Sequence, residues 1–110
     1  MLNIEPYRGI SLTNSWLEKI IIQLNKDLSM TGFDKVFETN LTALEFEQSA
    51  IHFFEDLLTK NDNQLFNLLY RIDVNQNQIV EGGSLPQVHI TKLIIEREFR
   101  KVVLKNEFSN

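Results

Sequence analysis

The chain has 110 residues, no cysteine and a formal net charge of −4 at pH 7. A chain of this length can form one domain with its own hydrophobic core, and the absence of cysteine excludes disulfides, thiolate metal sites and cysteine nucleophiles. The N-terminus has no basic segment followed by an apolar run, and the longest apolar runs, such as that at residues 20–22, are far too short to span a membrane. We therefore expect a cytoplasmic protein with no membrane among its partners.

Residues 1–13 alternate loosely between apolar and polar and include one proline and one glycine, so we expect an extended arm that packs on the body of the protein. A capping-box pattern, Ser15 with Glu18, then predicts the start of a helix over residues 15–30. This helix carries a single apolar stripe. Gly32 is placed to end it.

Two further helices are predicted in the middle of the chain. A second capping-box pattern, Thr42 with Glu45, begins a helix over residues 42–60. Its apolar residues cover nearly half of its surface, so we expect this helix to be central. Asp62 can cap the next helix, over residues 63–72.

The segment 87–105 predicts a helix with two apolar faces. At ~100° per residue, one face collects Val88, Ile95, Phe99, Val102 and Val103, and roughly opposite lie Ile90, Leu93, Ile94 and Leu104. A helix on a single core needs only one apolar stripe, so the second must meet another layer, a partner chain or a ligand. Because Arg97 and Lys101 interrupt the second face, we expect the first face to lie in the core and the second to face outward.

Basic residues are concentrated in this last helix. Residues 1–86 carry twelve acidic and six basic side chains, whereas residues 87–110 carry five basic and three acidic ones. Nucleic-acid binding needs a dense basic surface, which five cations spread around a helix among glutamates do not provide. We expect no nucleic-acid partner, and we interpret the basic helix as pairing with the acidic helix 42–60.

Glu47 is the acidic residue that the helix 42–60 places inside its apolar stripe. A buried carboxylate must be paired or protonated, and the candidate partners are Arg71, Arg97 and Arg100. Structural pairing is the favoured interpretation. The alternative is a small-ligand- or metal-binding bundle, with or without enzymatic activity, that has Glu47 as its interior carboxylate.

The histidines and the polar segment 73–77 do not complete a metal site. His52 has Glu55 and Asp56 one turn later, and His89 has no fixed acidic neighbour, whereas a zinc site needs three or four converging ligands. Segment 73–77 has oxygen donors at the spacing that begins an EF-hand loop, but the glycine and the closing glutamate of that loop are missing. We predict no metal ion and no other cofactor.

Together these elements predict an all-α fold, a single compact bundle of four main helices over residues 1–110 with an extended N-terminal arm. No catalytic constellation is visible. We expect a non-enzymatic protein that acts through self-association, with a dimer favoured, or through contact with a protein partner. The interface would be formed by Ile90, Leu93, Ile94, Arg97, Lys101 and Leu104. A more limited alternative encloses the helix 87–105 within one chain, covered by the arm.

Overall fold

The computed structural model describes residues 14–74 and 86–108. The helices in these residues are α1 (Asn14–Ser29), α2 (Ala43–Lys60), α3 (Asp62–Ile72) and α5 (Pro86–Phe108). The described residues contain no β-strand, and the predicted all-α bundle is confirmed. None of these helices is long and apolar enough to cross a membrane. The predicted arm over residues 1–13 lies outside the described residues.

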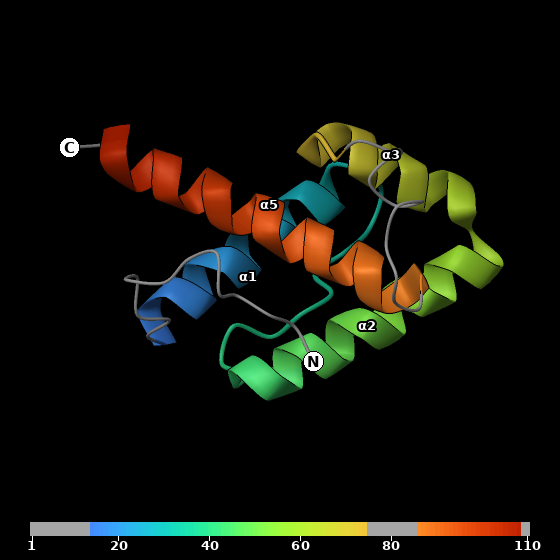
Figure 1. Cartoon of the computed structure of the whole chain (residues 1–110), viewed down its shortest axis with the longest axis horizontal. Coiled ribbons are helices and arrows are strands. Elements are labelled where there is room, and N and C mark those ends of the chain that lie inside the picture. Colours follow the sequence, from blue (N-terminus) through green and yellow to red (C-terminus); the bar gives the residue numbers. More distant parts are fainter. Residues whose placement is uncertain (1–13, 75–85, 109–110) are drawn as a thin grey trace.

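Helix α5 contacts each of the other three helices and runs diagonally across the molecule in Figure 1. Its buried residues are Ile90, Thr91, Ile94, Ile95, Glu98, Phe99 and Val102. At ~100° per residue these seven positions occupy one continuous arc of about 180°. The two predicted apolar faces are therefore the two edges of a single wide buried face.

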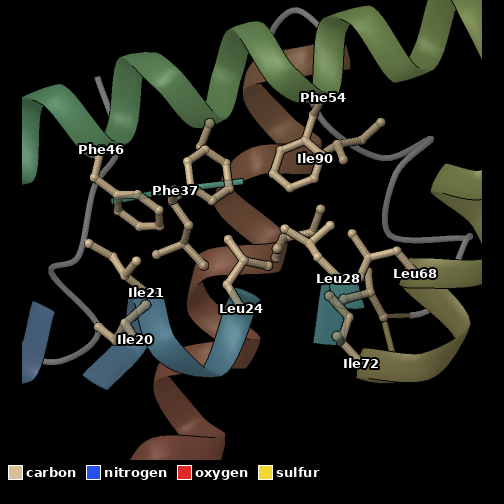
Figure 2. Close-up of a cluster of buried hydrophobic side chains, with 14 of the residues drawn as sticks. Ile20, Ile21, Leu24, Leu28, Phe37, Phe46, Phe54, Leu68, Ile72 and Ile90 are labelled. Atoms are coloured by element: carbon tan, nitrogen blue, oxygen red, sulfur yellow. The ribbon is translucent and has the colours of Figure 1, made fainter. Parts of the chain in front are cut away.

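The expectation that Ile90 and Ile94 face outward is wrong, because they are 1% and 0% exposed. Figure 2 shows Ile90 of α5 pointing into the same apolar cluster as Phe54 of α2. Helix α5 thus packs residues of both predicted faces within its own chain. Among the described residues the helices α1, α2 and α3 cover one side of it. The alternative prediction, that the arm over residues 1–13 covers this helix, concerns residues outside those described and stays a prediction.

The connection between α1 and α2 is held in the core by Asn25 and Phe37. The Asn25 side chain donates a hydrogen bond to the carbonyl oxygen of Phe37 at 2.8 Å and accepts one from its backbone N–H at 3.1 Å. The Phe37 ring packs edge-on against Phe46 and Phe53 of α2, with centroid separations of 5.4 and 5.7 Å (Figure 2 shows the first pair). Edge-to-face packing is favourable for aromatic rings, and here it fixes α2 over α1.

The helix ends largely follow the predicted local signals. The Thr42 side chain accepts a hydrogen bond from the backbone N–H of Glu45 at 3.2 Å, and the Glu45 side chain accepts one from the backbone N–H of Thr42 at 2.9 Å, so this capping box is confirmed. Gly32, with φ 99°, adopts the left-handed conformation just after α1. The cap of α3 is Asn61 and not the predicted Asp62, because the chain enters the helix one residue earlier.

Candidate functional site

A buried carboxylate on α1, Asp27, joins three helices. Its Oδ1 atom accepts a hydrogen bond from Arg71 Nε of α3 at 3.2 Å. Its Oδ2 atom accepts one from Lys101 Nζ of α5 at 3.0 Å and one from Gln23 Nε2 at 3.2 Å. Asp27 is only 2% exposed, so the two cations and the amide replace the water molecules that would hydrogen-bond to an exposed carboxylate.

Burial opposes ionisation of Asp27, but its partners outweigh that effect. Hydrogen bonds with Glu98, Lys101 and Gln23, together with the charge of Lys101, hold the pKa of Asp27 below its ordinary value. Asp27 is therefore the negative charge at the centre of this cluster at neutral pH.

A second carboxyl group, Glu98 of α5, lies beside Asp27 and is 0% exposed. Among the described residues, no donor group is within hydrogen-bond distance of either Glu98 oxygen, and Lys101 Nζ stands 3.6 Å from Oε1. Burial, followed by the neighbouring Asp27 carboxyl, raises the pKa of Glu98 to about 8, although Lys101 acts in the opposite direction. Glu98 therefore carries a proton at neutral pH, and as a carboxylic acid it can donate a hydrogen bond to Asp27.

The helical periodicity of α5 indicates that Glu98 is buried, but this is missed when the helix is described as having two opposite apolar faces. At ~100° per residue, Glu98 and Thr91 fall on the shorter arc between Ile94 and Ile95. A polar residue flanked on both sides by apolar positions is expected to be buried. The periodicity therefore makes Glu98 a candidate for burial, provided that the two apolar faces are recognised as one.

Glu47, the predicted interior carboxylate, is half-buried on α2. Of its three candidate partners, Arg71 binds the α1 carboxylate, Arg97 donates from Nε to the carbonyl oxygen of Ile72 at 3.0 Å, and Arg100 is exposed. The buried carboxyl groups of the described residues belong instead to α1 and α5. Among these buried carboxyl groups, Asp27 of α1 is the one that pairs with an arginine, Arg71.

A second feature is the solvent-facing side of α5, which we call the outer stripe. It consists of Leu93, Glu96, Arg97, Arg100 and Leu104. A cavity of about 230 Å³ lies between this stripe and the end of α3. It is lined by Asp73, Val74, Leu93, Glu96, Arg97 and Arg100. The cavity therefore combines two apolar side chains with both signs of charge.

Three of the predicted interface residues, Leu93, Arg97 and Leu104, lie on the outer stripe. Arg97 is held in place there, because its Nη2 atom is also 3.7 Å from the carboxylate of Asp73. The predicted isoleucines belong to the core, as described above. Lys101 turns the other way, toward α1. The outer stripe is thus narrower than the predicted interface.

The described residues include no group of three or more His, Cys, Asp or Glu side chains that could hold a metal ion. His52 is exposed and His89 is half-buried. Of the polar segment 73–77, only Asp73 and Val74 are described, and the rest lies outside the described residues.

Comparison with known proteins found no family model that matches the chain. No curated protein and no solved structure matches it either.

Proposed function

We propose that this chain is a non-enzymatic helical protein that acts by self-association, forming a dimer through the outer stripe of α5. The observation that carries the proposal is the composition of the stripe and its cavity, which combine leucine side chains with acidic and basic groups on one solvent-facing side of the helix.

The apolar part of the proposed contact comes from the two leucines. Leu104 is 47% exposed, and Leu93 is partly buried at the cavity. They stand three helical turns apart on one side of α5, about 16 Å along the axis. Isolated exposed leucines are common, but an exposed Leu104 on the same side of the helix as a cavity lined by Leu93 offers a second helix both a protruding side chain and a recess.

The charges of the outer stripe and of the cavity beside it favour a second copy over a foreign partner. A two-fold interface brings the same patch of both copies together, so the patch must be complementary to itself. A strongly one-signed patch would repel its own copy, whereas here Asp73 and Glu96 accompany Arg97 and Arg100. Each acidic side chain can thus face a guanidinium group of the second copy.

The test is the molar mass measured by light scattering on a sizing column over a range of protein concentrations. We expect twice the 12.9 kDa of the chain. In Leu104→Asp a charge replaces an exposed leucine, so the fold should survive while dimerisation weakens by about 2 kcal/mol or more, about thirtyfold in the dissociation constant. Circular dichroism of the same samples checks that the helices remain.

The matched control is Leu44→Asp on α2, because Leu44 is 53% exposed and lies outside the outer stripe. This variant should keep the mass of the wild type. A wild-type protein that stays monomeric at every concentration, or a Leu104→Asp variant that keeps the dimer mass, would contradict the proposal.

A further inference from the structure

The proposed dimer makes no use of the buried pair formed by Asp27 and Glu98, which lies on the opposite side of α5. The pair sits where α1 meets α5, with Arg71 of α3 also in contact with Asp27. The buried residues that α2 contributes to the core are Phe46, Ala50, Phe54 and Leu57, all apolar. Among the described residues, the charged groups that face the pair are therefore Arg71 on α3 and Lys101 on α5.

The arrangement of the neighbouring donors leaves Asp27 as the group with which Glu98 can form a hydrogen bond. The donors around it, Arg71, Lys101 and Gln23, are bound to Asp27, and none reaches a Glu98 oxygen within hydrogen-bond distance. Two ionised carboxylates cannot hydrogen-bond to each other, because both groups only accept. A proton between them removes one negative charge and supplies the missing donor.

We propose that Asp27 and Glu98 form a proton-dependent switch: one shared proton holds α1 against α5, and its loss loosens this junction. The inference goes beyond the proposed dimer, since it concerns contacts within one chain. The raised pKa of Glu98, about 8, and the lowered pKa of Asp27 agree with a proton that resides on Glu98.

The direction of the pH effect follows from linkage. The pKa of Glu98 is higher in the folded chain than its ordinary value of 4.5, so the folded state binds this proton more tightly than the unfolded state does. The resulting stability is complete below pH 4.5 and is lost progressively as the pH rises to about 8. Because one proton is linked to folding, each unit rise in pH within that window lowers the folding equilibrium constant by up to about tenfold.

Asp27 acts in a different pH window. Because its folded pKa is lowered, the stability it contributes is present above its ordinary value of 3.8 and is lost as the pH falls through the lowered pKa. The two effects therefore do not overlap, and a change between pH 5 and pH 8 reports on Glu98, apart from the two histidines.

Trp16 is the only tryptophan and lies at the same junction, since its ring centroid on α1 is 5.8 Å from that of Phe99 on α5. Its fluorescence therefore reports whether α1 stays packed on α5. Urea unfolding followed by this fluorescence at pH values from about 5 to 9 gives the folding constant at each pH.

The variant that tests the switch is Glu98→Gln, because glutamine has nearly the same shape and its amide N–H can donate to Asp27 without ionising. We expect the wild-type folding constant to fall as the pH rises and the Glu98→Gln constant to be nearly flat. The control is Glu55→Gln, an exposed glutamate of α2, which should reproduce the wild-type profile. Equal pH profiles for the wild type and Glu98→Gln would overturn the proposal.

A second measurement does not depend on any variant folding. Carbon-13 NMR of the glutamate carboxyl groups in the wild type should show one glutamate that titrates near pH 8. If every glutamate titrates below about pH 6, the proton is not held and the switch does not exist. The same titration in Leu104→Asp separates this result from dimerisation, because the pair does not involve the outer stripe.

Discussion

At the scale of single residues, the strongest polar interactions converge on Asp27. Its carboxylate is bound by cations from α3 and α5, whose side chains are 36% and 21% exposed. Buried ion pairs are costly to form, yet removing one member leaves the others without compensation. The cluster therefore ties three helices together in one specific arrangement.

Replacing this carboxylate tests that role. Asp27→Ala should lower the free energy of unfolding by about 3 kcal/mol, because Lys101 and Arg71 lose their buried partner and Glu98 loses its acceptor. The exposed pair of Lys35 with Glu38 is the control, and Lys35→Ala should cost less than about 1 kcal/mol. Urea unfolding at constant pH measures both, and similar losses for the two variants would refute the role of Asp27.

At the scale of elements, the helices begin and end where short-range chemistry dictates. The reciprocal hydrogen bonds of Thr42 and Glu45 satisfy two backbone N–H groups at the start of α2 that have no partner within the helix. Such a cap acts within one turn and needs no contact with the rest of the protein. This explains why the beginning of α2 was predictable from the sequence.

The cap of α2 should contribute measurably to stability. Thr42→Ala removes the side-chain acceptor and should cost about 1 kcal/mol. Thr59→Ala is a matched control, because Thr59 is also exposed and its hydroxyl donates only to carbonyl groups of its own helix. We expect a change within about 0.5 kcal/mol there. Thermal unfolding followed by circular dichroism compares the two variants, and equal melting temperatures would argue against the cap.

At the scale of the whole molecule, α5 serves as the element around which the other helices pack. Its buried half faces α1, α2 and α3, whereas its outer stripe faces solvent. The same helix thus organises the core with one side and, in the proposed dimer, contacts a second copy with the other. Substitutions on the two sides should therefore have different consequences.

Substitutions of Ile94, on the buried side, and of Leu104, on the outer stripe, test this difference. Ile94→Ala should lower the free energy of unfolding by about 2–5 kcal/mol, because it removes apolar contacts and leaves a cavity in a site that is 0% exposed. At protein concentrations at which the chain is monomeric, Leu104→Ala should leave the free energy of unfolding within about 0.5 kcal/mol. Urea unfolding gives both values, and a small effect at Ile94 would mean that α5 is not the centre of the core.

The local sequence signals were sufficient to predict where the helices lie along the chain. Each helix begins within one residue of its predicted start. The predicted ends also agree within one residue except that of α5, which continues past residue 105 to Phe108. Apolar periodicity, capping boxes and a glycine after α1 are properties of neighbouring residues, so a single sequence carries them. The all-α class follows from the same properties.

The identity of the buried acidic residues required the packing of the helices. Glu47 and Glu98 both stand next to apolar residues along their helices, yet Glu47 is half-buried and Glu98 is fully buried. The difference arises because α5 is covered over half of its circumference by three helices, and periodicity along one helix does not say how many neighbours will cover it. For the same reason the pairing of Asp27 with side chains 44 and 74 positions away along the chain appears only once α1, α3 and α5 are packed together.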